Sequence, residues 1–211
     1  MNLDKLREAE SLFLHRYPGG FDNEEIQAIV RKRHNVGRLS EFAAETLARP
    51  RFRHTAQVLD DIVKIVSRSS MVSMFEKPKF KRFVEGLARD DRSLLASAFQ
   101  RTLHGSQQKG FTDLVDLLAE AGLAKWSLAT ICLYQYRPET EVFVKPTTTK
   151  NVIRQFELDG LVYRPRPSWA FYQAYREAIA QMKAAVSPAL APNNAAFTGF
   201  LMMSTAVGQP D

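Results

Sequence analysis

The sequence predicts an all-α fold, a compact multi-helix domain with at most one short extended segment. Apolar residues recur at helical spacing through most of the 211 residues, and the alternating runs typical of strands are nearly absent. The hydrophobic content of 45% suffices for a sizeable core, and no low-complexity stretch interrupts the chain. We therefore expect a single helical domain over residues 1–211.

The first half of the chain divides into helices at recognisable breaks. The apolar stripe of the first helix consists of Leu3, Leu6, Ala9 and Phe13. Tyr17-Pro18-Gly19-Gly20 ends that helix, and Asp22 or Asn23 can cap the second. A later stripe consists of Val58, Ile62, Ile65 and Val66. Further helices are predicted near 39–48, 54–67, 78–88, 91–103, 112–121 and 125–136.

The centre of the chain contains the one expected extended segment. Before it, Asp90 or Asp91 is expected to cap the helix that Gly105 ends. After the helix at 125–136, Pro138 forces the chain out of the helical conformation. The β-branched and aromatic residues at 141–144 then favour an extended conformation.

Prolines organise the last third. Pro146 precedes Thr147-Thr148-Thr149, any of which can cap a helix running through Phe156. Arg164-Pro165-Arg166-Pro167 is a stiff connector and a candidate sub-boundary. A long helix then begins at Ser168, and a final apolar helix is predicted over 194–205. The long helix carries a broad apolar face made of Trp169, Tyr172, Tyr175, Ile179 and Met182, which is typical of core packing.

The charge and cysteine content narrow the class of protein. Lysine and arginine number 29 against 23 acidic residues, a net charge of +6 that favours a polyanionic partner. Two basic clusters stand out: Arg31, Lys32, Arg33, Arg38, Arg49, Arg51 and Arg53, and then Lys77, Lys79, Lys81 and Arg82. A single cysteine, Cys132, lies in an apolar helix and is expected in the core. We expect no cofactor, no metal site and no membrane partner, and a cytoplasmic protein.

Two predicted helices meet at a tight turn formed by Gly122-Leu123-Ala124. Glycine permits a close reversal, the leucine can plug the core, and the amides at the start of the next helix point outward. This pattern resembles the helix-hairpin-helix motif, with alanine in place of its second glycine. The stretch from Phe111 to Phe156 resembles the helix-hairpin-helix base-excision DNA glycosylases. In that comparison Lys125-Trp126-Ser127 matches a basic residue, a tryptophan and a small hydroxyl residue, as in the monofunctional branch that excises alkylated bases.

The resemblance implies DNA as partner, either as an intact duplex or as a distorted or damaged one. The residues expected to contact it are Gly122, Leu123, Ala124, Lys125, Trp126, Ser127, Gln107, Gln108, Lys109, Lys145, Thr147, Lys150 and Arg154. Trp126 is either a buried anchor or a base-stacking residue. His104, which precedes Gln107, Gln108 and Lys109 in the sequence, is expected to act as a helix C-terminal cap favoured by the helix dipole. Asp113, Asp116 and Glu120 make the first hairpin helix acidic, which opposes phosphate binding.

The catalytic aspartate of the family has no counterpart, because residues 143–150 contain no acid. A glycosylase needs that carboxylate to stabilise the oxocarbenium charge or to activate water. Glu139 and Glu141 lie just upstream at a different spacing, and we expect both to be exposed loop carboxylates. No catalytic residue is assigned.

Three functions stay open. The first is a glycosylase-like helical protein that binds DNA without excising a base. The second is a protein-interaction or homo-oligomeric scaffold that docks through the helix at 168–186 or the apolar C-terminus. The third is a DNA glycosylase with a rearranged active site.

Overall fold

A computed structural model describes residues 1–33 and 36–206 of the chain, without the side chains of 29–36 and 206. The predicted all-α class is confirmed, since this described part contains eleven α-helices, three short 3-10 helices and no strand. Its longest helices, α6 and α10, have 16 residues each. No helix among the described residues combines the length and the apolar character needed to cross a bilayer.

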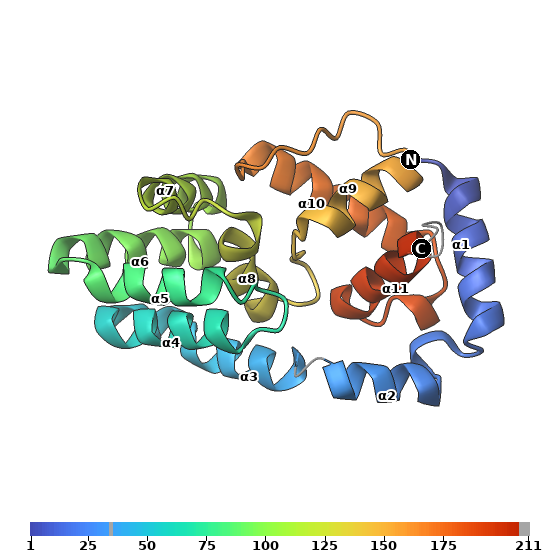
Figure 1. The fold of residues 1–211 in the computed structure, drawn as a ribbon, viewed down its shortest axis with the longest axis horizontal. Coiled ribbons are helices and arrows are strands. Elements are labelled where there is room, and N and C mark those ends of the chain that lie inside the picture. The colour runs from blue at the N-terminus through green and yellow to red at the C-terminus, as the bar shows by residue number, and fades with distance from the viewer. Residues whose placement is uncertain (34–35, 207–211) are drawn as a thin grey trace.

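The helices follow one another with short connections (Figure 1). In the first half they are α1 (Leu3–Arg16), α2 (Glu24–Arg33), α3 (Val36–Thr46), α4 (Thr55–Arg68), α5 (Glu76–Gly86) and α6 (Arg89–His104). In the second half they are α7 (Gln107–Glu120), α8 (Trp126–Tyr136), α9 (Pro146–Gln155), α10 (Trp169–Ala184) and α11 (Asn194–Ala206).

Helix α8 lies between two groups of helices in the elongated molecule (Figure 1). On one side it contacts α3, α4, α6 and α7. On the other side α11 packs against α9 and α1. Ten of the eleven residues of α8 are buried, as expected for a helix that is apolar all round. The predicted core position of Cys132 is confirmed, and burial raises the pKa of its thiol to about 12.

The predicted helix boundaries are confirmed in part. Asn23 accepts a hydrogen bond from the Glu25 amide, and Gly105 ends α6, as expected. The capping threonines of α9 were predicted wrongly, because α9 begins at Pro146 with Lys145 as its N-cap residue. The predicted caps of α6 were also wrong. Ala88 is the N-cap, and the two aspartates lie in the first turn, where their charge still favours the helix dipole.

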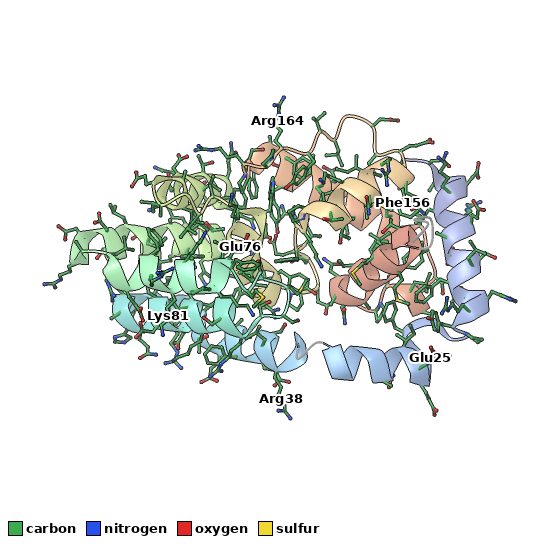
Figure 2. The ribbon with its side chains drawn as sticks, in the orientation of Figure 1. Glu25, Arg38, Glu76, Lys81, Phe156 and Arg164 are labelled. Atoms are coloured by element: carbon green, nitrogen blue, oxygen red, sulfur yellow. The ribbon has the colours of Figure 1, made fainter. Side chains whose placement is uncertain are left out.

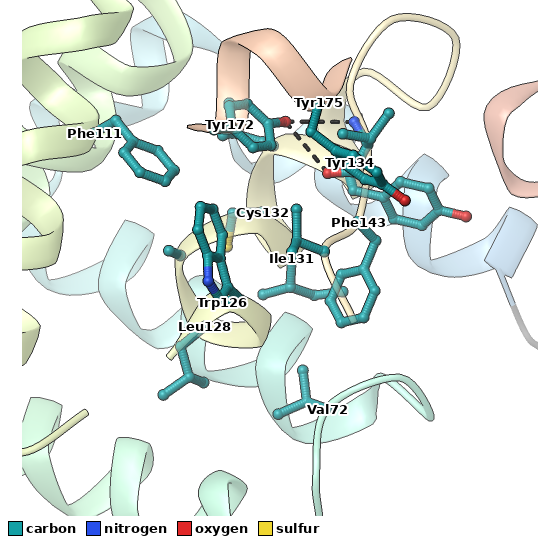
Figure 3. Packing of buried hydrophobic residues seen from close by; sticks show 14 of the residues in the cluster. Val72, Phe111, Trp126, Leu128, Ile131, Cys132, Tyr134, Phe143, Tyr172 and Tyr175 are labelled. Carbon is teal, nitrogen blue, oxygen red and sulfur yellow. Dashed lines mark hydrogen bonds between the residues drawn. The ribbon is translucent and has the colours of Figure 1, made fainter. Parts of the chain in front are cut away.

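The extended segment at 141–144 forms no sheet ladder. Its backbone instead bonds to side chains of the neighbouring helices. The Val144 amide donates to the Thr130 hydroxyl of α8 at 3.2 Å. The Val142 amide donates to the Tyr172 hydroxyl of α10 at 3.4 Å, and Figure 3 shows the bonds of this hydroxyl as dashed lines. These bonds satisfy buried amides that lack a strand partner, and they fix the approach to α9.

A close crossing of α6 and α7 requires glycine at position 110. A Cβ atom built there would lie 2.2 Å from the Thr102 amide nitrogen and 2.6 Å from the Arg101 carbonyl carbon. Both atoms belong to the backbone and cannot rotate away. The two helix axes therefore approach too closely for any side chain at Gly110.

We predict that Gly110→Ala lowers the free energy of unfolding by about 3 kcal/mol, at the upper end of overpacking costs, because the α6 backbone must shift. Denaturant unfolding followed by circular dichroism measures this change. Gly86→Ala is the matched control, since its Cβ would meet open space, and its effect should stay within about 1 kcal/mol. Equal stability of the two variants would contradict the close crossing.

His104 does not cap its own helix, contrary to the expectation. Its Nε2 lies 2.8 Å from the Leu47 carbonyl oxygen, so the ring joins the end of α6 to the end of α3. Burial, together with the positive charges of Arg137 and Arg49, lowers the pKa of His104 below 6.5, although the bond to Leu47 opposes this. The neutral imidazole is therefore favoured, and the helix dipole does not determine its charge.

We predict that His104 weakens the fold as the pH falls below about 6.5. In that range His104 takes up a proton more readily in the unfolded chain than in the folded chain. The contribution of neutral His104 to the free energy of unfolding is therefore complete above pH 6.5 and is lost as the pH falls toward the lowered pKa. Denaturant unfolding between pH 7.5 and pH 5.5 should show a smaller loss for His104→Gln than for the wild type. His15→Gln, on the exposed surface of α1, is the control and should keep the wild-type slope.

Candidate nucleic-acid interface

A tight turn joins α7 to α8, at the position that the sequence indicated. Gly122 has a φ of +67°, a conformation that favours glycine, and its amide donates to the Ala119 carbonyl at 2.9 Å. Leu123 follows with only 5% of its surface exposed, and its amide donates to the Leu118 carbonyl at 2.7 Å. Leu123 therefore plugs the turn, and Gly122 lies on the outside.

The first turn of α8 leaves backbone donors without a partner. Lys125 is the N-cap residue, and its side chain makes no capping bond. The first amide to find an acceptor belongs to Ala129, which donates to the Lys125 carbonyl at 3.0 Å. In the described part of the chain, the amides of Trp126, Ser127 and Leu128 donate to no protein oxygen. These amides and the helix dipole make this end of α8 electropositive.

Helix α9 begins in the same way. Lys145 is its N-cap residue without a side-chain cap, and Pro146 has no amide hydrogen. Its first bonded amide is that of Thr149, which donates to the Lys145 carbonyl at 2.8 Å. Thus each of the two helices starts with a lysine where an oxygen-bearing side chain would ordinarily stand.

Both helix starts open into one cleft of about 670 Å³. The connection between α4 and α5 forms its other wall, and Tyr163 and Pro165 close one end. Lys77, Lys125 and Lys145 line the cleft, and none of these three makes an ion pair with another described residue. We call this the cationic cleft.

Glu76 is the carboxylate of the cationic cleft, and the sequence analysis missed it. It is the first residue of α5, at the end that faces α8 (Figure 2). Its Oε2 accepts a hydrogen bond from the Ser127 hydroxyl at 2.5 Å. The two residues are 51 positions apart, so no local motif links them.

The outer face of α9 extends the positive surface. Thr147, Lys150 and Arg154 are exposed and share one face at helical spacing. The Lys150 ammonium lies 5.9 Å from the centre of the Tyr163 ring. Of the predicted contacts, Lys125 and Lys145 line the cationic cleft, and Thr147, Lys150 and Arg154 lie on the helix that begins there.

Two roles were considered for Trp126, a buried anchor and a base-stacking residue, and the structure shows the buried anchor. It is 1% exposed and lies among the core residues that Figure 3 shows. Its indole N–H donates to the Arg164 carbonyl at 2.7 Å, and its ring lies 5.1 Å from that of Phe171. It forms part of the floor of the cationic cleft but offers no open face to a base. Tyr163, which is partly exposed, is the aromatic ring that the cleft presents.

The second group of predicted contacts lies elsewhere. Gln107, Gln108 and Lys109 form the first turn of α7, and the rest of the helix, Gly110–Glu120, separates this turn from the hairpin by about 17 Å. Gln108 and Lys109 are exposed, whereas Gln107 donates to Glu141 at 2.8 Å. The structure does not bring these three residues to the cationic cleft.

Glu141 is buried, which corrects the expectation of an exposed loop carboxylate. It is 2% exposed and accepts hydrogen bonds from Arg176 and from the Tyr172 hydroxyl, each at 2.8 Å. Burial and the charge of Glu141 raise the pKa of Tyr172 well above its usual range. These bonds and that from Gln107 compensate the desolvation of the carboxylate. Glu139 is exposed, as expected.

The acidic face of α7 is partly neutralised. Asp113 pairs with Arg101 at 2.7 Å, and Asp116 pairs with Arg166 of the proline-rich connector at 2.8 Å. Glu120 remains exposed beside the turn. The repulsion that the sequence suggested between α7 and a phosphate is therefore smaller than a count of its acids implies.

The two basic clusters of the sequence lie on different elements. Lys77 belongs to the cationic cleft, and Lys79, Lys81 and Arg82 are exposed along α5. In the other cluster, the side chains of Arg31, Lys32 and Arg33 lie outside the described residues.

Comparison of the chain with protein-family models, curated proteins and solved structures finds no match.

Proposed function

We propose that this protein binds duplex DNA at the cationic cleft without excising a base. One observation carries the proposal: the first residues of two helices, α8 and α9, line the same cleft, and each helix has lysine as N-cap residue and unpaired amides in its first turn. Helix N-termini attract anions through their amides and their dipole, and phosphate is the anion that DNA presents at regular intervals.

The N-cap lysines strengthen this inference. A positive charge at a helix N-terminus is unfavourable, and serine, threonine, aspartate or asparagine would stabilise either helix by about 1 kcal/mol. Lys125 and Lys145 both break this local rule at the same cleft. Local rules are broken most often at functional sites, and a bound phosphate would offset the cost at both helices.

The lysine at position 145 also bears on catalysis. The resemblance to base-excision glycosylases assigns an aspartate to this stretch. An ammonium group there would repel the positive charge that develops on the sugar during base excision. Binding to the phosphate backbone needs the opposite charge, which Lys145 supplies.

Glu76 supports a second candidate, base excision by a rearranged active site. It brings to the cationic cleft the carboxylate that such a reaction requires. Incubation of the protein with oligonucleotides carrying alkylated or deaminated bases tests this candidate. Release of a free base by the wild type and its loss in Glu76→Gln would establish excision and overturn the proposal of binding alone.

The scaffold alternative stays a prediction, and the structure buries only part of the surface that suggested it. The apolar face of α10, with Phe171, Tyr172 and Tyr175, packs inside the molecule. Phe197 and Phe200 of α11 are also fully buried. Met202 of α11 keeps 37% of its surface exposed, and a homo-oligomer also remains a prediction.

We predict that Lys125→Glu and Lys145→Glu each weaken binding to a short duplex about tenfold at low salt. Each change removes one phosphate contact and adds repulsion, so it should also reduce the slope of log K against log salt by about 1. Fluorescence anisotropy over a salt series measures both quantities. Lys109→Glu is the matched control, because the same charge change lies at the far end of α7. Binding that ignores salt, or an equal loss in the control, would contradict the proposal.

We predict the opposite sign for Glu76→Gln, which should tighten duplex binding about threefold, because it removes the negative charge from the cationic cleft while keeping an acceptor for Ser127. Glu85→Gln serves as control, since Glu85 lies on the same helix but pairs with Lys81. Weaker binding by Glu76→Gln would show that this carboxylate does not face the phosphates.

A further inference from the structure

A second hollow, of about 800 Å³, adjoins the cationic cleft and has no part in the proposed function. Met71 and Lys145 line both hollows, so the two are neighbours. Most of its wall is apolar, and the larger contributors include Phe21, Met71, Tyr134, Pro138 and Met202. We call it the apolar pocket. Small-molecule sites have volumes of about 300–1,000 Å³ and apolar walls with a few polar groups, and the apolar pocket matches both criteria.

Small residues on two helices keep the apolar pocket open. Helix α11 presents Ala195, Ala196 and Gly199 to it, and α3 presents Gly37 and Ser40. These helices belong to the two groups that flank α8 (Figure 1). Protein interiors contain few voids larger than a water molecule, because side chains normally fill them. The short side chains at these five positions therefore preserve a space that larger residues would occupy.

Tyr134 brings an unsatisfied hydroxyl to the apolar pocket. It is 1% exposed, and its hydroxyl bonds to no other described residue. Among the described residues, the sealed side-chain atoms without a partner are Arg101 Nε and the Ser204 hydroxyl, so the Tyr134 hydroxyl stays open to the pocket that the residue lines. Burial raises the pKa of Tyr134, which keeps this hydroxyl protonated and able to donate. A ligand acceptor would recover the free energy that its burial costs.

The start of α9 adds further donors to the same pocket. Lys145 makes no ion pair with another described residue. Thr148 is 8% exposed, and neither its hydroxyl nor its amide bonds to a described residue. Glu139 also lines the pocket, but it is exposed and borders a second hollow on its other side, so water screens its charge. The unsatisfied groups that are buried here are thus donors, beside one cation.

We propose that the apolar pocket binds a small monocarboxylate with an apolar body. The carboxylate pairs with Lys145 and accepts hydrogen bonds from Tyr134 and Thr148, and the body packs against the small residues of α11. A carboxylate accepts at two oxygens and donates at none, which complements a set of donors beside a cation. A phosphate without an apolar body would leave most of the wall uncovered. A neutral nucleobase would leave Lys145 without a counter-charge.

The shared lysine links this ligand to the cationic cleft. A carboxylate paired with Lys145 withdraws one of the three lysines that line the cleft. Ligand binding therefore weakens DNA binding, and by reciprocity DNA weakens the ligand. This consequence rests on the proposed function, whereas occupation of the apolar pocket does not.

Titration calorimetry with the full chain tests the pocket, using decanoate and 1-naphthoate as a chain-like and a ring-like probe. We expect one-to-one binding of at least one probe, and binding about tenfold weaker in Tyr134→Phe and in Lys145→Gln, because each variant removes one bond to the carboxylate. Tyr134→Phe deletes a group that has no protein partner, so its thermal unfolding should match the wild type. Tyr136→Phe is the control on the same helix, outside the pocket, and should keep the wild-type affinity.

Ligand controls separate the two halves of the recognition. Decanol lacks the charge and acetate lacks the apolar body, so each should bind at least tenfold more weakly than decanoate. Absence of binding by both carboxylate probes, or binding that neither variant weakens, would overturn the proposal. Equal binding of decanol or of acetate would overturn it too. Binding of free adenine that Tyr134→Phe weakens, without binding of either carboxylate, would assign the pocket to a nucleobase instead.

Duplex anisotropy at saturating decanoate distinguishes this inference from the proposed function. We expect about threefold weaker duplex binding and a salt slope smaller by about 1. Decanoate binding by a protein that binds no duplex would overturn the proposed function and leave the pocket. Duplex binding by a protein that takes up neither probe would overturn the pocket and leave the proposed function. Binding of both, each unaffected by the other, would overturn the link through Lys145.

Discussion

Helix α8 is enclosed on every side from Trp126 to Gln135, and the rest of the fold is arranged around it. A helix without a polar face must be covered all round, so α3, α4, α6 and α7 pack on one side of it. The Thr130 hydroxyl then holds the extended segment that leads into α9. Val144 lies just before α9 and Thr130 lies near the start of α8. The bond between them therefore brings the N-termini of the two helices to the same cleft. Core packing thereby determines the electrostatics of the surface.

The charged groups of the molecule separate into a paired set and an unpaired set. Glu141 is buried and bonded to Arg176, Gln107 and Tyr172, which locks α7 and α10 to the chain before α9. Such a network fixes a geometry, and removing one partner leaves a buried charge unpaired. At the cationic cleft the lysines have no ion pair among the described residues. The first set accounts for the architecture, and the second is available to a ligand.

Periodicity and turn chemistry predicted most helices and the turn at Gly122, because these features depend on residues close in sequence. Contacts between distant residues could not be predicted in the same way. The bond from Ser127 to Glu76 spans 51 positions, and the burial of Glu141 depends on Arg176, 35 positions away. Gln107 was grouped with the hairpin because it is near in sequence, but the length of α7 places it at the opposite end. The start of α9 was missed because the three threonines suggested an N-cap, whereas Pro146 itself occupies the first position of the helix.

The absence of an acid at the start of α9 has a physical meaning beyond the loss of a catalytic group. An aspartate at position 145 would accept hydrogen bonds from the free amides of α9 and would satisfy that helix within the protein. Lys145 leaves the amides of Thr147 and Thr148 without an acceptor and adds a positive charge beside them. Lys125 does the same at α8. Since Glu76 alone cannot balance three lysines and two helix dipoles, the cationic cleft is short of negative charge. An anion from outside the chain, such as a DNA phosphate, meets this need, and a neutral or positively charged ligand would not.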